Sequence, residues 1–305
     1  MTFRLKILGS NAAVAAFNRH QTAQILQVNN NYFLIDCGEG TQLRLGKARV
    51  KINSIDHVFI SHLHGDHYFG LIGLLSTMHL FGRKKELFLY CPAGLREIID
   101  LQLKHSETIL NYKINYLFTD MEEDNLLFEN NDLTIEKFLL NHRIFCSGFL
   151  FREKIKPRKI QKDKIPEDLK LADMAKLKKG EDIFDTDGKV KYENALLTFP
   201  PKPSRSYAYC SDTKYDTSLI PTISGVDLLY HEATFTKEME ERAEKTYHST
   251  AEQAGLLAKN AGVKKLLIGH FSVRYRELDP VLKEAKSAFP ESYLAIEGEF
   301  IDVKE

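Results

Sequence analysis

The stretch Val58-Phe-Ile-Ser-His-Leu-His-Gly-Asp-His67 places four metal-ligand side chains within six positions. A run of β-forming residues precedes them, and a tight turn and an apolar helix are expected to follow. His62 and His64 are two residues apart, so in an extended segment both side chains lie on the same side. Asp66 and His67 come next, on the turn into the helix. Three imidazoles and one carboxylate at this spacing predict a metal centre rather than isolated structural histidines.

Three further ligand-type residues, His142, Asp212 and His270, also follow strand-like runs. Side chains at strand ends meet at one edge of a layered sheet, where loop-borne sites lie. Seven ligands exceed the needs of one tetrahedral ion and suit two ions that share a carboxylate. Imidazole and carboxylate ligands favour Zn²⁺, with Mn²⁺ as the alternative. Because such ions lower the pKa of bound water, the pattern predicts a hydrolase with two Zn²⁺ per subunit.

Strand-like runs and helical patterns are mixed along the chain. The strand-like runs lie at residues 5–8, 24–28, 32–35, 58–60, 87–90, 207–210, 228–230, 266–268 and 293–296. Helical patterns lie at residues 68–81, 95–104, 236–245, 250–261 and 280–288. This mixture predicts an α/β protein in which helices cover sheets, and 305 residues are enough for one large domain or two small ones.

The composition gives no general preference for nucleic acid, since 42 Lys and Arg balance 42 Asp and Glu. Any basic surface must therefore be local. The four cysteines are widely spaced and are expected to be reduced and buried. The first residues alternate like a strand rather than a signal peptide, and no apolar run is long enough to span a bilayer. A cytoplasmic protein without membrane contact is expected.

Residues 152–179 break the layered pattern with 11 Lys or Arg against 5 Asp or Glu. Pro157 and Pro166 and a low apolar content accompany this charge, and four acidic residues follow between 181 and 187. The composition predicts an inserted arm at about residues 152–190. A solvated charged loop without a binding role is the alternative interpretation.

The motif around His62 resembles the signature of the metallo-β-lactamase superfamily. A closer resemblance is to one branch, the ribonuclease Z family of tRNA 3′-processing endonucleases, and its segments are spread in order over nearly the whole chain. These segments are Asp36-Cys-Gly-Glu-Gly-Thr-Gln42, Phe59 to His67, Phe69-Gly-Leu-Ile-Gly-Leu-Leu-Ser-Thr77, Pro200-Pro-Lys-Pro-Ser-Arg-Ser206, Tyr209-Cys-Ser-Asp-Thr213, His231-Glu-Ala-Thr-Phe235, His248-Ser-Thr250 and Gly269-His-Phe-Ser-Val-Arg-Tyr275.

The resemblance implies a single domain over residues 1–305, a four-layered αβ/βα sandwich with an inserted flexible arm and a dinuclear site at one edge. It also implies which residues bind each ion. One ion is expected on His62, His64 and His142, the other on Asp66, His67 and His270, with Asp212 bridging them.

The implied reaction is removal of the 3′ trailer from tRNA precursors by a zinc-dependent endoribonuclease. It leaves a 3′-hydroxyl on the tRNA and a 5′-phosphate on the trailer. Asp66 is expected to accept the proton of the attacking water, and His248 to protonate the leaving 3′-oxygen. Glu232 would orient His248. An alternative is that His248 only neighbours the cap of the helix that starts near Thr250.

Substrate contacts are expected in two places. Arg274 and Ser272 follow His270 and suit phosphate binding, although a surface salt bridge is the alternative for the arginine. Lys178 and Lys179 lie on the limb of the arm that matches the family's tRNA-gripping arm. The resemblance also implies a homodimer in which the arm of one subunit assists the site of the other.

Two other functions stay open at this point. A small-molecule phosphodiesterase or arylsulfatase of the same superfamily would need the same metal cluster, whereas lactamase and thioesterase activities fit the His248 and His231 segments poorly. A metal-stabilised RNA-binding protein without turnover is the alternative of another class. The complete set of seven ligands argues against it, because binding alone does not need an open dinuclear site.

Overall fold

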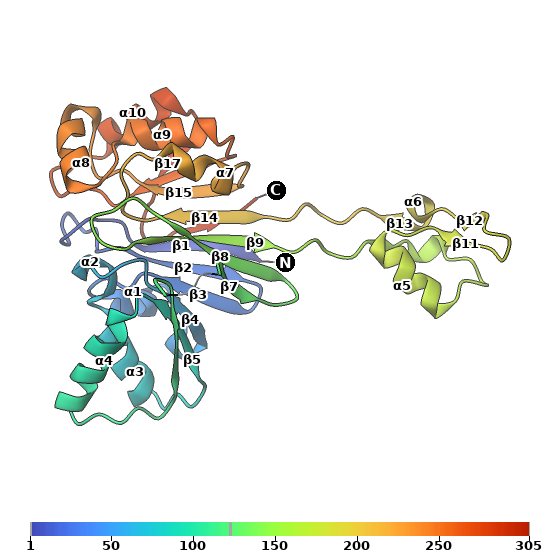
Figure 1. The fold of residues 1–305 in the computed structure, drawn as a ribbon, viewed down its shortest axis with the longest axis horizontal. Coiled ribbons are helices and arrows are strands. Elements are labelled where there is room, and N and C mark those ends of the chain that lie inside the picture. The colour runs from blue at the N-terminus through green and yellow to red at the C-terminus, as the bar shows by residue number, and fades with distance from the viewer. Residues whose placement is uncertain (1, 122–123, 305) are drawn as a thin grey trace.

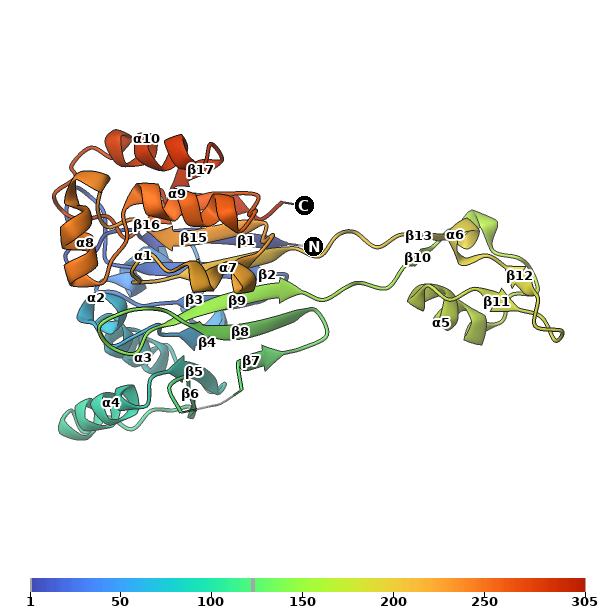
Figure 2. The same ribbon diagram turned by 45° about the horizontal axis from the view of Figure 1, so that its top comes forward.

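A computed structural model describes residues 2–121 and 124–304. Two large β-sheets lie face to face, and helices cover the outer face of each sheet (Figures 1 and 2). A slender segment projects from one end of this body. The expected α/β sandwich of four layers with an inserted arm is therefore confirmed.

The first sheet has seven strands in the order β18-β1-β2-β3-β4-β5-β6. β3, β4, β5 and β6 are parallel to one another, and the pairs on the β1 side are antiparallel. The strands are β1 (Phe3–Gly9), β2 (Ala23–Val28), β3 (Asn31–Ile35), β4 (Ile55–Phe59), β5 (Leu87–Cys91), β6 (Ile114–Phe118) and β18 (Phe300–Asp302).

The second sheet also has seven strands, in the order β17-β16-β15-β14-β9-β8-β7. Like the first sheet, it has a parallel part and an antiparallel part. β14 to β17 are parallel, whereas β7, β8, β9 and β14 pair antiparallel. The strands are β7 (Leu126–Glu129), β8 (Leu133–Leu139), β9 (Ser147–Glu153), β14 (Ser206–Cys210), β15 (Leu228–Glu232), β16 (Leu266–Gly269) and β17 (Ser292–Leu294).

The helices of the body fall into two groups. On the side of the first sheet lie α1 (Thr41–Lys47), α2 (Gly65–Tyr68), α3 (Leu71–Leu80) and α4 (Gly94–His105), with the 3-10 turn η1 (Ile52–Ser54). On the side of the second sheet lie α7 (Ile220–Ile223), α8 (Glu240–Thr246), α9 (Ala251–Asn260) and α10 (Asp279–Ala288), with η3 (Thr217–Leu219) and η4 (Lys237–Met239). Over the described ranges, no helix combines the length and apolar character needed to cross a membrane.

Three apolar clusters hold the layers together. Between the sheets, large aromatic side chains such as Phe33, Phe59 and Phe149 pack at no more than 1% exposure. A second cluster joins the first sheet to α1, α3 and α4, and a third joins the other sheet to α7, α9 and α10. Burial of these apolar faces is the main driving force for the layered arrangement.

The segment after β4 differs from the sequence expectation. The prediction of a single helix over residues 68–81 that starts near Tyr68 was wrong. α2 already begins at Gly65, and the helical structure is interrupted before α3. The interruption includes Gly70, where an added Cβ would lie 2.1 Å from the carbonyl oxygen of Gly38. Gly38 itself has no room for a Cβ, which would lie 2.6 Å from the carbonyl oxygen of Asp66. Both glycines thus permit close backbone packing beneath the histidine-rich turn.

The helix expected at residues 236–245 is also divided. It begins with the 3-10 turn η4 and continues as α8, which ends at Thr246.

The chain leaves the sandwich after β9 and returns at β14, so residues 154–205 form the projecting arm (Figure 1). Its tip has a small apolar core of its own, which contains Leu177, Ile183 and Leu197. The arm elements are β10 (Lys159–Ile160), η2 (Lys162–Lys164), α5 (Leu171–Lys179), β11 (Ile183–Phe184), β12 (Val190–Tyr192), α6 (Asn194–Leu197) and β13 (Thr198–Phe199). The tip is therefore a folded unit on two extended limbs, rather than an irregular loop.

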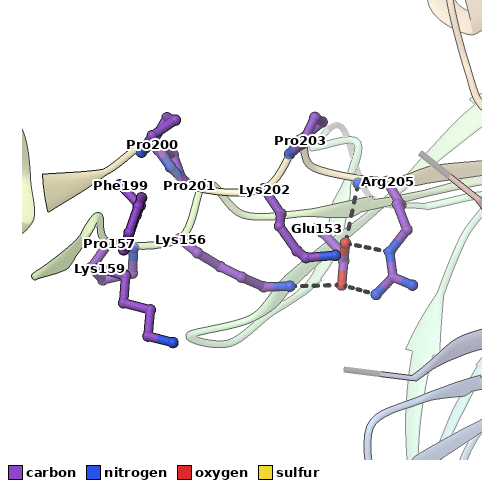
Figure 3. Close-up of a pocket in the computed structure, with 10 residues that line it drawn as sticks. All are labelled: Glu153, Lys156, Pro157, Lys159, Phe199, Pro200, Pro201, Lys202, Pro203 and Arg205. Atoms are coloured by element: carbon purple, nitrogen blue, oxygen red, sulfur yellow. Dashed lines mark hydrogen bonds and ion pairs between the residues drawn. The ribbon is translucent and has the colours of Figure 1, made fainter. Parts of the chain in front are cut away.

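An ion-pair network ties the two limbs together where they join the body (Figure 3). Arg205 donates to both carboxylate oxygens of Glu153, through Nε at 2.8 Å and Nη2 at 2.7 Å. Lys156 Nζ lies 3.2 Å from the same carboxylate, whose side chain is 2% exposed. A cavity of about 460 Å³ opens beside this network, and the prolines of both limbs contribute to its lining.

Candidate metal centre and active site

Three of the predicted ligands converge from two loops, each of which follows a strand of a different sheet. His62 follows β4, His64 directly precedes α2, and His142 follows β8. His64 Nδ1 lies 3.0 Å from His62 Nε2 and 3.2 Å from His142 Nε2. With one oxygen of Asp212, these atoms all lie within 4.8 Å of one another. The group therefore has the size and the atom types of a metal-binding site.

Asp66, His67 and His270 form a second group beside the first. His67 Nε2 and His270 Nε2 are 3.3 Å apart, and Asp66 Oδ2 lies 3.6 and 3.4 Å from these two atoms. The backbone N–H of Ala13 donates to Asp66 Oδ2 at 2.7 Å and fixes this carboxylate from the loop after β1.

Asp212 lies between the two groups and turns one oxygen toward each. Its Oδ2 is 3.6 Å from His62 Nε2 and 3.9 Å from His142 Nε2. Its Oδ1 is 3.3 Å from His67 Nε2 and 3.2 Å from His270 Nε2, yet this buried oxygen accepts no hydrogen bond. A buried carboxylate oxygen without a hydrogen bond fits an atom that is built to coordinate a cation.

Four of the five histidines use Nδ1 for a hydrogen bond to an acceptor outside the cluster, which leaves Nε2 directed at its centre. This arrangement is typical of metal-binding histidines. The pairs are His62 with the Ser61 hydroxyl at 3.0 Å, His67 with the Asp36 carboxylate at 2.8 Å, His142 with the Tyr247 carbonyl at 2.9 Å and His270 with the Thr234 hydroxyl at 2.8 Å.

Asp36 supports the centre and was not identified as a site residue from the sequence. It is fully buried directly after β3, in the left-handed backbone region with φ of 55°. Besides His67, its carboxylate accepts hydrogen bonds from the Ser61 N–H at 2.8 Å, the Ser61 hydroxyl at 2.9 Å and the Tyr209 hydroxyl at 2.6 Å. Asp36 follows the end of a strand, as the predicted ligands do, and this position was the signal in the sequence that could have identified it.

The electrostatics of the cluster favour bound cations. Burial disfavours the charged form of His67, but the carboxylates of Asp212, Asp66 and Asp36 outweigh it and raise the pKa of His67 well above its usual value. Burial also opposes ionisation of Asp66 and Asp212, yet the surrounding imidazoles lower the pKa of both carboxyl groups. The cluster thus contains buried negative charge that attracts a positive partner, and the residues fit a pair of divalent ions.

His248 lies beside the cluster and is held by Glu232. Its Nδ1 is 2.8 Å from Glu232 Oε1, and Thr234 donates to the other carboxylate oxygen at 2.6 Å. Burial disfavours the imidazolium, but the Glu232 carboxylate outweighs it and raises the pKa of His248 to about 9. Thr250 does cap α9 with its side chain, so the cap and a chemical role for His248 can coexist.

A cavity of about 510 Å³ opens over the cluster and His248. Arg143, Arg242 and Arg274 line it, and among the residues that the structure describes the acidic ones in its lining are Asp66 and Asp212. Arg274 Nη1 donates to the Ser272 hydroxyl at 3.3 Å, and both residues face the cavity. The cavity therefore suits a negatively charged substrate, although the chain as a whole has no net charge.

The other expected substrate residues lie elsewhere. Lys178 and Lys179 are at the end of α5 in the arm, exposed to solvent and outside the cavity lining. The sequence had not indicated Arg143 or Arg242, since neither lies in a recognisable phosphate-binding motif.

Comparison with known proteins gives relatives of nearly the same length. A protein named Ribonuclease Z from Cytophaga hutchinsonii is 49% identical over 298 residues, covering 98% of this chain and 95% of the relative. Ribonuclease Z from Bacteroides fragilis is 43% identical over 301 residues and covers 97% of each chain. The family model described as Anti-Pycsar protein Apyc1 matches residues 3–155.

Solved structures agree with these sequence matches. Human tRNase Z, short form, has a TM-score of 0.70 at 26% identity, covering 99% of this chain and 100% of the human one. The metallo-beta-lactamase fold protein YhfI from Bacillus subtilis reaches the same TM-score at 21% identity, covering 99% of this chain and all of YhfI, which shows the shared fold. This chain belongs to the ribonuclease Z family, as the identity to its curated relatives over nearly the whole length demonstrates.

Proposed function

We propose that this protein is a zinc-dependent endoribonuclease that removes the 3′ trailer from tRNA precursors in the cytoplasm. The products are a tRNA with a 3′-hydroxyl and a trailer with a 5′-phosphate. One observation carries the proposal. All seven ligand-type residues converge in a chain that is 49% identical to a Ribonuclease Z over nearly its full length.

The proposed centre holds two Zn²⁺ per subunit, with Mn²⁺ as a substitute. The first ion would be held by His62, His64 and His142, and the second by Asp66, His67 and His270, with Asp212 shared between them. The two oxygens of Asp212, each facing one group, support this division. When bound, two such ions promote deprotonation of water and offset the negative charge on the phosphate oxygens.

The protein side chains supply the proton transfers. Asp66, at the edge of the cavity, would accept the proton of the attacking water. His248, kept protonated by Glu232, would contact the scissile phosphate and donate a proton to the leaving 3′-oxygen. The attack forms the new phosphorus–oxygen bond on the trailer side while the bond to the 3′-oxygen breaks.

Substrate binding is proposed to involve the cavity and the arm. Arg274 and Ser272 would contact phosphate oxygens near the cut, because a guanidinium and a hydroxyl both donate to them. Lys178 and Lys179 would contact the tRNA backbone from the arm. Structured RNA is recognised largely by shape and backbone, so binding should weaken as salt rises.

We also propose a homodimer. The arm leaves the body at the end of β9 and the start of β14, whereas Asp212 and His142 lie at the opposite strand ends. The seven residues of β9 correspond to roughly 20 Å between these edges, and the arm extends further away (Figure 2). An arm so directed lies far from the cavity of its own subunit, and a second copy would bring it near a cavity.

The alternative is a small-molecule phosphodiesterase or arylsulfatase. An open cavity of about 510 Å³ admits a small diester as well as an RNA strand, so the cavity alone does not separate these functions. The folded arm favours the RNA substrate, because a small ester would have no contact with it.

The test uses the purified full-length chain with added Zn²⁺ or Mn²⁺ and an unprocessed tRNA that carries a 3′ trailer. Both product ends are mapped, and the Asp66→Ala variant serves as the blank. A single cut after the discriminator base with a 3′-hydroxyl, absent in the variant, is expected. Hydrolysis of a small phosphodiester or sulfate ester without any cut in the RNA would replace the proposal with the alternative.

A further inference from the structure

His64 differs from the other four histidines of the metal cluster in its outer hydrogen bond. Those four donate from Nδ1 to a hydroxyl, carboxylate or carbonyl oxygen, as described above. His64 instead turns Nδ1 toward the centre, and its outer Nε2 lies 2.9 Å from Nη2 of Arg143. A guanidinium can only donate hydrogen bonds, so His64 Nε2 must be the acceptor.

This contact fixes the tautomer of His64. If Nε2 accepts from Arg143, the single ring proton of the neutral imidazole is on Nδ1. That proton points at His62 Nε2 at 3.0 Å and His142 Nε2 at 3.2 Å, whose lone pairs both face the centre. The proton therefore occupies the place where a cation would sit.

Cation binding through His64 Nδ1 would require the other tautomer. Nδ1 would have to give up its proton, and Nε2 would then carry one and turn from acceptor into donor. Two donors, the Nε2–H and the Arg143 guanidinium, would face each other at 2.9 Å. The hydrogen bond to Arg143 and a cation on His64 are therefore mutually exclusive.

We propose that Arg143 is a substrate-phosphate residue that is held on His64 in the cation-free protein and released when the metal site is loaded. This inference rests on the proposed function, which assigns His64 as a ligand. Arg143 is exposed at the wall of the cavity, so its guanidinium can turn to an anion without crossing the core. The guanidinium of Arg143 would then donate its hydrogen bond to a non-bridging phosphate oxygen of the RNA. That oxygen can accept the bond, whereas the metal-bound imidazole of His64 cannot.

The other role for Arg143 is that of a fixed support for His64. The two roles predict opposite changes in metal affinity when Arg143 is removed. A support that orients a ligand improves metal binding, so its removal weakens the affinity. A competitor for the ligand opposes metal binding, so its removal strengthens the affinity.

The experiment compares Arg143→Met with Arg274→Met in the full-length chain. Both arginines line the same cavity, but Arg274 hydrogen-bonds Ser272 and no metal ligand. Zn²⁺ affinity is measured by competition with a chromogenic chelator, at low salt and in 1 M salt. Arg143→Met is expected to bind the first Zn²⁺ roughly three- to ten-fold more tightly, the effect of losing one competing hydrogen bond. Arg274→Met should leave the affinity unchanged.

Salt separates hydrogen-bond competition from simple charge repulsion. At 1 M salt the screening length falls to about 3 Å, so a gain that came only from removal of a positive charge would disappear. We expect the gain to persist. The proposed move of Arg143 from His64 to a phosphate would be overturned if the gain in Zn²⁺ affinity disappeared at high salt. Unchanged or weaker Zn²⁺ binding in Arg143→Met would also overturn it.

Steady-state cleavage gives the second readout. Both variants should raise KM for a tRNA precursor about ten-fold, because each removes one guanidinium that would donate to a phosphate oxygen. An unchanged KM for the precursor in Arg143→Met would remove Arg143 from substrate binding. If the wild-type chain bound no Zn²⁺, the proposed function itself would fail; if it bound Zn²⁺ and Arg143→Met bound it no better, only this inference would fail.

Discussion

Asp36 offers the sharpest test of how the fold supports the proposed metal centre. Its carboxylate accepts four hydrogen bonds, from the Ser61 N–H and hydroxyl, His67 Nδ1 and the Tyr209 hydroxyl. In Asp36→Asn the side chain keeps one acceptor oxygen, which can retain the Ser61 N–H. Its new NH₂ group would face the other three donors, so these buried bonds are lost or must rearrange.

The magnitude follows from these contacts. A hydrogen bond to a charged group contributes about 1.5–3 kcal/mol, and some donors can find other partners. The free energy of unfolding of the metal-free protein should therefore fall by about 2–4 kcal/mol. For 305 residues this corresponds to a decrease in Tm of about 3–6 °C. Loss of the partner that orients a metal-binding histidine should also weaken metal affinity by about 10–100-fold.

The expected effect is specific to the ion that His67 would hold. In a Zn²⁺ competition titration, Asp36→Asn should keep one tight site while the second weakens. Asp227→Asn is the matched control, because Asp227 is also a buried carboxylate that accepts from a serine N–H and hydroxyl, those of Ser206 at 2.7 and 2.8 Å. That variant should lose stability and retain both sites. Equal loss of Zn²⁺ in the two variants would refute the role of Asp36.

Three further predictions concern catalysis, substrate range and acid stability. His248→Ala should keep both metal ions, measured by elemental analysis, but lose most turnover of a tRNA precursor; full activity would remove His248 from the mechanism. Replacing residues 155–203 by a short linker should impair cleavage of tRNA precursors and spare a small phosphodiester, and equal loss on both substrates would contradict a substrate role for the arm. Burial lowers the pKa of His57 from 6.5 to about 4, so the folded state excludes a proton that the unfolded chain binds. Stability should thus be complete above about pH 6.5 and fall by at most about 3 kcal/mol as the pH drops to 4, whereas urea titrations of His57→Leu should show a flatter dependence over this range.

Much of the fold was accessible from the sequence because local patterns determine it. The strands at β1 to β5 and β14 to β17 were predicted from short β-forming runs, and α4, α9 and α10 from helical patterns. β6, β9 and β18 were not predicted. β18 pairs with β1 almost 300 residues away, Asp302 opposite Arg4, and no local window contains such a partner.

The arm marks another limit of sequence patterns. Its charge indicated an insertion, but its folded tip depends on a few apolar side chains such as Leu177, Ile183 and Leu197. So small a core gives no clear periodicity. The pairing of Glu153 with Arg205 at the arm root likewise joins residues 52 positions apart.

The contrast between local patterns and contacts formed only on folding also explains which parts of the candidate site were predicted. The ligand types could be predicted because each follows a strand and is chemically unusual there. Asp36, Thr234 and Arg143 were missed, since what they do depends on which ring nitrogen each one meets in the folded protein.

The way the ligands are divided between the sheets has a mechanical consequence. His62, His64, Asp66 and His67 follow β4 in the first sheet, whereas His142, Asp212 and His270 follow strands of the second. Each of the two ligand groups draws members from both sheets. A cation in either group would therefore link the two halves of the sandwich at the edge where the cavity opens. Among the described residues, no ligand group lies at the opposite edge, where the arm begins. Metal binding should therefore stiffen the edge with the cavity far more than the root of the arm.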